Sequence, residues 1–161
     1  MPMPRIDIKV EGVEKLKELL VRRYEALKRI LDQELLQVCE EAVTHAKENK
    51  GYKDHTSNLK NSMSFALYYD GQLITMVEGQ IPHPEEATNG QDEVRENLMG
   101  YCQKEGVVAP KGYSLIIAPG MNYGKYVEAK GYSVVYMTRD FLSDEATRAV
   151  TEALQIVKEL R

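Results

Sequence analysis

Apolar residues recur every three or four positions along the first third of the chain, and this spacing predicts one long helix from about Val13 to Asn49. No glycine or proline interrupts the stretch, so the helix would extend for about 50 Å. Two alternatives follow for its apolar stripe: it packs within its own domain, or part of it packs on a partner chain. The stripe consists of Val13, Leu16, Leu20, Tyr24, Leu27, Leu31, Leu35, Val38, Ala42 and His45.

After the helix, apolar and polar residues alternate, which is the pattern typical of β-strands. Met63 to Tyr69 and Leu73 to Glu78 flank Asp70-Gly71, and an Asp-Gly pair between two alternating runs is a strong hairpin signal. Tyr113 to Ala118 predicts the next strand, which Pro119-Gly120 ends. The β-branched and aromatic run from Tyr132 to Met137 then predicts a further strand, so that the tract between them would be a tight aromatic turn.

Three other segments complete the predicted organisation. Ile6 to Val10 alternates apolar and polar residues, which predicts a short strand or an extended arm. Residues 81–112 hold three prolines and carry a net charge of −3, with six acidic and three basic residues. We expect this segment to be an exposed excursion between strands, with a short helix from Glu93 to Lys104. A second amphipathic helix follows from Phe141 to Leu160, with Thr138 or Ser143 as its cap.

These elements predict an α+β fold in one domain spanning residues 1–161. The long N-terminal helix and the C-terminal helix would pack on one face of a small antiparallel sheet, with an insertion at about residues 81–112.

Composition narrows the range of functions. The formal net charge of −4 provides no electrostatic attraction to nucleic acid, and no apolar run approaches the length of a membrane span. The first residues lack the basic and apolar regions of a secretory signal. Cys39 and Cys102 lie far apart in the sequence and have no metal-type spacing, so we expect free thiols in a reducing cytoplasm.

The sequence contains no recognisable catalytic motif. The tract Gly120 to Lys125 resembles a phosphate-binding loop only superficially, because three residues separate its glycines and Tyr126 follows the lysine. The three histidines, His45, His55 and His83, show no ligand spacing. We interpret His45 as a packed or capping histidine and the residues around His55 as a polar turn. We therefore expect no cofactor, no metal and no enzymatic activity; a hydrolase centred on His55 or a metal site at His45 is a minor alternative.

The aromatic composition is unusual, with ten tyrosines and no tryptophan. Tyrosine suits surfaces that are half-buried or contact a partner. The cluster could therefore form an interface, or it could line the edge of the domain's own core. Its members are Tyr113, Tyr123, Tyr126, Tyr132 and Tyr136.

Two tracts resemble a family of bacteriophage proteins that join the head to the tail in long-tailed phages. The first, Tyr52 to Met63, is similar to the family segment T-G-N-L-(R/K)-x-S-(I/M). Ser57 stands where glycine is usual in that segment. The residues that match are Thr56, Asn58, Leu59, Lys60, Ser62 and Met63.

The second tract, Gly120 to Glu128, is similar to the family element x-Y-(A/G)-x-Y-V-E-x-G. Here Ala129 and Lys130 precede Gly131, which makes the approach to the glycine slightly longer. The residues that match are Tyr123, Gly124, Tyr126, Val127 and Glu128. The long first helix and the closing helix also agree with the family, and the resemblance covers most of the chain outside residues 81–112.

The resemblance implies a non-enzymatic structural protein that completes the tail or joins head to tail at the virion neck. Such a protein comes from a phage or prophage and assembles in the cytoplasm of the bacterial host. It would form a homo-oligomeric ring and contact other neck, portal or tail proteins, with no specific nucleic acid and no membrane. The alternative is a small cytoplasmic ligand-binding or regulatory domain, with the tyrosine cluster lining a pocket.

A ring needs two different patches that meet, and the long helix and the tyrosine-rich turn are our candidates. Within the turn, the candidate interface residues are Tyr123, Tyr126, Glu128 and Tyr132. Glu128 either accepts backbone hydrogen bonds that fix the turn or pairs with a neighbouring cation. The insertion at residues 81–112 is a further candidate surface for a second neck protein.

Overall fold

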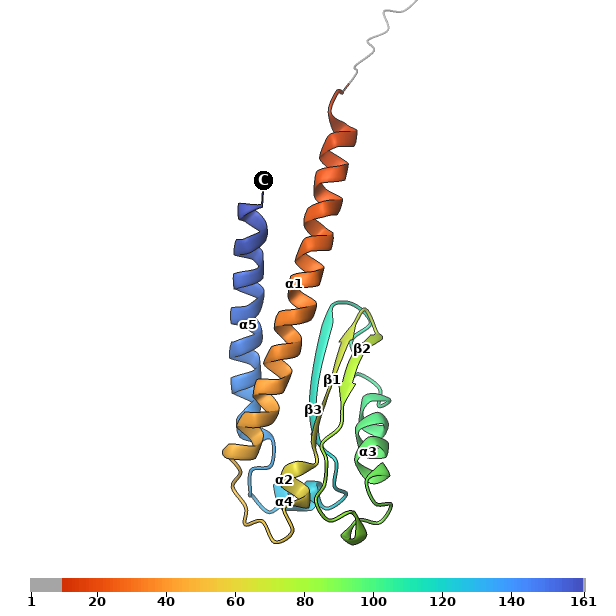
Figure 1. Cartoon of the computed structure of the whole chain (residues 1–161), viewed down its shortest axis with the longest axis vertical. Helices are drawn as coiled ribbons and strands as arrows, with labels where there is room; N and C mark the ends of the chain where they lie inside the picture. The colour runs from red at the N-terminus through yellow and green to blue at the C-terminus, as the bar shows by residue number, and fades with distance from the viewer. Residues whose placement is uncertain (1–9, 161) are drawn as a thin grey trace, which may run out of the picture.

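A long helical hairpin lies beside a three-stranded sheet in the computed structural model, which describes residues 10–160 (Figure 1). The arm predicted from Ile6 to Val10 therefore lies outside the described residues, apart from Val10 itself. The α+β fold class predicted from the sequence is confirmed. In chain order the elements are α1 Val13–Glu48, α2 Asn58–Asn61, β1 Met63–Tyr69, β2 Gln72–Val77, the 3₁₀ turn η1 Pro84–Glu86, α3 Asp92–Cys102, β3 Tyr113–Pro119, α4 Gly124–Ala129 and α5 Tyr136–Glu159.

The predicted long helix is confirmed as α1, a single helix of 36 residues and thus about 54 Å long. It ends at Asn49, whose backbone N–H and side-chain amide both donate to the His45 carbonyl, at 2.9 and 3.0 Å. The C-terminal half of α1 is packed, and Leu35, Val38 and Ala42 are buried there. Its N-terminal end extends well past the tip of the sheet (Figure 1).

The predicted hairpin is confirmed as β1 and β2, and β3 pairs with the other side of β1. The strand order is β2-β1-β3, and both pairings are antiparallel. Leu67 of β1 packs with Leu35 and Val38 of α1, whereas Ala66 on the opposite face packs with Leu98 of α3. The central strand is therefore buried on both faces, and the sheet separates α1 from α3.

The expectation that helices cover only one face of the sheet is wrong. Helix α3, which the sequence predicted from Glu93 to Lys104, covers the opposite face and buries Val94, Leu98 and Cys102. The sequence between β2 and α3 is mostly exposed, as expected, but it is tied to the sheet. The Gln91 side chain accepts from the Ile81 N–H at 3.0 Å and donates to the Gly79 carbonyl at 2.7 Å.

The predicted strand from Tyr132 to Met137 is also wrong, because α5 already begins at Tyr136. Thr138 and Ser143 lie inside this helix, so neither is its cap; the cap residue is Val135. Helix α5 packs mainly along α1 and only weakly against the sheet. A strand at Tyr132 would have to pair beside β3, but the chain there passes directly into the helix.

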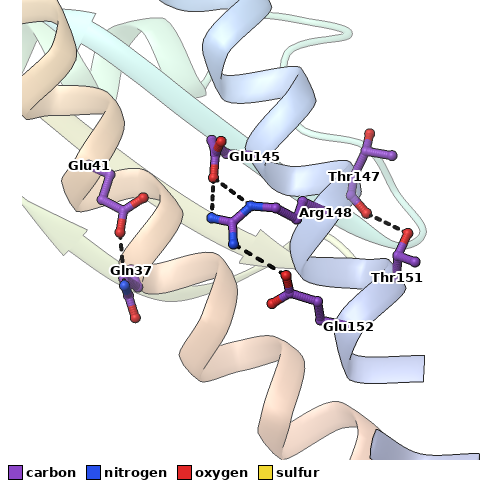
Figure 2. A network of polar contacts seen from close by, with 7 residues as sticks. All are labelled: Gln37, Glu41, Glu145, Thr147, Arg148, Thr151 and Glu152. Carbon is purple, nitrogen blue, oxygen red and sulfur yellow. Dashed lines mark hydrogen bonds and ion pairs between the residues drawn. The ribbon is translucent and has the colours of Figure 1, made fainter. Parts of the chain in front are cut away.

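The pair of helices α1 and α5 carries polar contacts on its outer surface. Figure 2 shows Arg148 of α5 between Glu145 and Glu152 of the same helix, with Gln37 and Glu41 paired on the facing part of α1. These are exposed contacts between residues three or four positions apart on a helix. Contacts of this kind contribute on the order of 0.5 kcal/mol or less each, so the hairpin depends on its apolar seam.

Candidate interaction surfaces

The two tracts that carry the family resemblance meet in one cluster at the end of the molecule where α1 terminates. Leu59 and Met63 of the first tract pack there with Met121 and Val134, which belong to the second tract and its continuation. Tyr52 and Val127 pack against the edge of this cluster. We call this cluster the joint. Most of the matched residues therefore have a structural explanation within the chain.

Asn58 is the most tightly held polar residue of the joint. Its side chain is buried, donates to the His83 carbonyl at 2.7 Å and accepts from the His83 N–H at 2.9 Å. The residue before it, Ser57, has a φ of 61°, in the left-handed region that favours glycine. Ser57 is the position at which the family segment usually has glycine, so the backbone turn is retained with serine in its place.

Ser62 joins the first tract to the second, and Ser64 binds a residue just after the β-hairpin. The buried Ser62 hydroxyl donates to the Leu59 carbonyl at 2.8 Å and accepts from the Gly120 N–H at 3.0 Å. Ser64 accepts from the Gly79 N–H at 2.9 Å. A side chain at Gly120 would be within 2.8 Å of Val94 on α3, so only glycine allows this close approach.

Glu128 accepts backbone hydrogen bonds and so resolves the alternative left open by the sequence. One of its carboxylate oxygens accepts from the N–H groups of Val134 and Val135, at 2.7 and 3.0 Å. Glu128 sits on α4, a short helix that takes the place of the expected tight turn between strands. These two N–H groups belong to the residues just before Tyr136, the first residue of α5, so the Glu128 carboxylate holds the backbone at the entry to the helix, where a negative charge is also favourable. Glu128 therefore fixes where α5 begins.

The tyrosine cluster divides into an internal residue and four exposed ones. Tyr113 is half-buried, and its hydroxyl donates to the Asp32 carboxylate at 2.6 Å. The other four are between 41% and 70% exposed and lie around α4 and the start of α5. Tyr123 and Tyr136 line different cavities, of about 380 and 540 Å³, so the cluster does not converge on a single pocket.

The second exposed apolar surface is the end of α1 that extends past the sheet, which we call the overhang (residues 13–24). Six apolar side chains on these three turns are each at least 39% exposed: Val13, Leu16, Leu19, Leu20, Val21 and Tyr24. Helix α5 ends at the base of the overhang, where the Arg23 guanidinium donates to the Leu160 carbonyl at 3.0 Å. Burying the exposed half of such a side chain is favourable by roughly 1 kcal/mol. Covering the overhang with another apolar surface would therefore be favourable.

Three tyrosines mark where the overhang meets the sheet. The Tyr24 and Tyr69 hydroxyls lie 2.7 Å apart, and this hydrogen bond raises the pKa of Tyr69 to about 12. Burial and the bond to Asp32 raise the pKa of Tyr113 as well. The phenols of Tyr69 and Tyr113 therefore stay neutral to higher pH than a free tyrosine, at the boundary between covered and uncovered α1.

The residues considered for chemistry have structural roles. His45 stacks on Phe141 with ring centroids 4.4 Å apart and contacts the Thr138 hydroxyl at 3.1 Å, as expected of a packed histidine. Cys39 and Cys102 are unpaired and buried, and burial raises the pKa of Cys39 to about 12. Within residues 10–160, no three His, Cys, Asp or Glu side chains lie close enough to hold a metal ion. No helix in this range is both long and apolar enough to cross a bilayer.

One buried carboxylate was missed by the sequence analysis. Glu93 of α3 accepts from the Thr88 N–H at 2.7 Å and from the Asn122 N–H at 2.8 Å, and so connects the insertion to the second tract. It belongs to a helix whose other acidic residues are exposed, and only its position beside Val94 on the buried side of that helix could have indicated its role.

Comparison of the chain with protein-family models, curated proteins and solved structures yields no match.

Proposed function

We propose that this chain is a structural protein of a long-tailed bacteriophage or prophage that acts at the head–tail junction, as a tail-completion or head–tail joining component. It has no enzymatic activity and functions as a ring of identical subunits at the virion neck, after assembly in the host cytoplasm. The proposal rests on the resemblance of the two tracts to this family of neck proteins.

The observation that carries the proposal is that the two tracts, separated by more than fifty residues, form one joint. Asn58, Leu59 and Met63 of the first tract are buried there, as is Gly124 of the second. A chance similarity in sequence gives no reason for two matched segments to pack on each other. The left-handed backbone at Ser57 adds support, because it explains why glycine suits that position.

The exposed surfaces also support a role as a structural subunit. Both the overhang and the tyrosines around α4 expose apolar side chains on the outside of the fold. They lie at opposite ends of the long axis (Figure 1). A subunit that joins its neighbours through two different patches builds rings when the rotation closes.

The direct test is to mix the full chain with the portal, neck and tail-end proteins of the same phage or prophage and to measure particle size by sedimentation. We expect the chain to enter a complex with at least one of them. A chain that remains monomeric and binds no virion component would contradict the proposal. Genes for a portal, a major capsid protein and a tail tube beside its own gene would provide independent support.

The ligand-binding alternative is favoured by one observation only. Two adjoining cavities of about 540 and 560 Å³ lie along β3, within the size range of small-molecule sites. A screen that found a tightly bound small molecule in these cavities, with no affinity for virion proteins, would favour this alternative.

A further inference from the structure

The outer edge of β3 is an unpaired strand edge at the bottom of a groove. Strand β3 pairs only with β1 within the described sheet, so its other edge is open. The two adjoining cavities lie along this edge and share Tyr101, Ile117, Glu128 and Val135 in their linings. Helix α3 and the residues after it form one wall, and the start of α5 forms the other. We call this the β3 groove.

The backbone groups that face the groove can be identified from the pairing of β3 with β1. Hydrogen bonds from Asp70 N–H to the Gly112 carbonyl and from Gly120 N–H to the Ser62 carbonyl lie at the two ends of the ladder. In an antiparallel ladder, hydrogen-bonded pairs alternate with non-bonded pairs. The even-numbered residues of β3 therefore bond to β1, and the N–H and C=O groups of Leu115 and Ile117 point into the groove.

An apolar groove with free backbone donors and acceptors fits an extended peptide. Val107, Leu115, Leu142 and Val135 provide apolar walls, while the β3 edge would provide the hydrogen bonds of one more strand. Peptides that add to a sheet edge gain affinity in this way. The β2 edge suits an added strand less well, because a bulge opposite Leu67 and Tyr68 interrupts its register.

The chain itself contains a segment of the required pattern, Ile6 to Val10, which alternates apolar and polar residues. This segment cannot reach the groove of its own subunit. Tyr113, at the start of β3, is level with Asp32 of α1 through their hydrogen bond, and Asp32 lies 19 residues, or roughly 28 Å, from Val13 along the helix. Ile6 is seven residues from Val13 and extends about 24 Å at most.

We propose that residues Ile6 to Val10 of one copy of this chain bind in the β3 groove of a second copy, as an additional strand of its sheet. The arm and the groove are different surfaces, so each subunit gives an arm to one neighbour and accepts an arm from another. Such a contact is heterologous, the type that closes into rings. The inference deepens the proposed function, because it identifies a contact that would join ring subunits.

Disulfide crosslinking between full-length chains tests this contact directly. One chain carries a cysteine at a single arm position from 6 to 10, and the other carries Ile117→Cys. Neighbouring residues in paired strands have Cβ atoms about 4.5–5.5 Å apart, close enough for a disulfide after small adjustments. We expect mixed dimers to form at alternate arm positions only. Val150→Cys, on exposed α5 surface, replaces Ile117→Cys as the matched control and should give none.

A proline substitution provides a second, independent measurement. Ile117→Pro removes an N–H that faces the groove but no hydrogen bond to β1, so the sheet should be retained. We expect it to weaken self-association by about tenfold or more, since it removes a hydrogen bond and narrows the groove. Ile117→Val keeps the N–H and should stay within about threefold of the unmodified chain. Thermal unfolding of each variant checks that the fold is intact, and the crosslinking result stands without the proline variant.

The possible outcomes separate this inference from the proposed function. Alternating crosslinks together with weakened self-association would support arm exchange. If the chain joins virion proteins or forms rings but no arm position crosslinks, arm exchange is overturned while the proposed function stands. Alternating crosslinks in a chain that binds no virion component would retain arm exchange and contradict the phage role. A chain that neither crosslinks nor self-associates would overturn arm exchange.

Discussion

The two ends of α1 carry the same apolar pattern but have opposite surroundings. At the C-terminal end, Leu35 is only 2% exposed and packs against β1 and α5. At the N-terminal end, Leu16 occupies the same stripe but is 56% exposed. The pattern therefore predicts a helix and its apolar face, but not what covers that face. The C-terminal half of the helix packs in its own domain, and the apolar face of its N-terminal part is exposed.

The largest effect should come from truncating the stripe where it is covered. Leu35→Ala should lower the free energy of unfolding by about 3 kcal/mol, because it removes packed methyl groups and leaves a cavity. The matched change Leu16→Ala, on the same helix and stripe, should cost less than about 1 kcal/mol in dilute solution. Urea denaturation of both variants measures the difference. Equal losses would show that the overhang is already covered.

A substitution in the joint should lower the free energy of unfolding nearly as much as one in the covered part of the stripe. Asn58→Ala removes both hydrogen bonds to the His83 backbone and leaves those partly buried groups without their partner. We expect a loss of roughly 2–3 kcal/mol in the free energy of unfolding. The control is Asn89→Ala, whose side chain is exposed and bonds only to Glu96, and it should change stability by less than about 0.5 kcal/mol. An Asn58→Ala variant as stable as the control would remove the structural role assigned to this residue.

Two substitutions of Glu128 should have smaller effects on stability, and the two effects should differ in size. Glu128→Ala leaves the Val134 and Val135 N–H groups without their acceptor, at a cost of about 1–2 kcal/mol. Glu128→Gln retains a carbonyl oxygen for both groups and should cost less than half as much. Chemical denaturation gives both values. If Gln and Ala are equally destabilising, the negative charge matters more than the hydrogen bonds, and the alternative of a cation partner regains support.

The tyrosines at the boundary of the overhang predict a loss of stability at high pH. The pKa values of Tyr69 and Tyr113 are raised in the folded chain, to about 12 for Tyr69, whereas an unfolded tyrosine titrates near a pH of about 10. Below that pH the contribution is fully present. Above it the unfolded chain releases protons first, so stability falls as pH rises from about 10 to 12.

Tyr113→Phe should make the fall of stability with pH shallower, because it removes one of the tyrosines whose pKa is raised. The decline should not disappear, because the pKa of Tyr52 in the joint is also raised by burial. The free energy of unfolding measured at several pH values, for both proteins, checks the prediction. A decline of the same steepness in both would show that Tyr113 does not contribute.

Most of the helices and strands that were predicted correctly have a local pattern in the sequence. The spacing along α1, the Asp-Gly hairpin and the run at Tyr113 each depend on neighbouring residues, and each was predicted correctly. The run from Tyr132 to Met137 was predicted as a strand because of its residue types. It failed because the Glu128 carboxylate, six and seven residues earlier, holds the backbone of Val134 and Val135, and α5 begins at Tyr136 directly after them. A side-chain contact of this kind overrides the β-propensity of the individual residues.

The candidate site was less predictable than the fold. The matched residues looked equivalent in the sequence, but Asn58 and Ser62 are internal, Glu128 fixes a helix start, and Tyr126 is exposed on the surface. The β3 groove had no signal in the sequence, since it depends on which strand lies at the edge of the sheet. The arm was predicted to be extended, but only the length of α1 shows that it is too short to reach the groove of its own subunit.

The most direct test of this account is the sedimentation of the full chain over a range of concentrations, alone and with the portal and tail-end proteins of its phage. We expect self-association that is weakened by Leu16→Asp with Leu20→Asp, while the fold is unchanged, and entry into a complex with a virion protein. A monomer at every concentration that sediments alone in every mixture would contradict it.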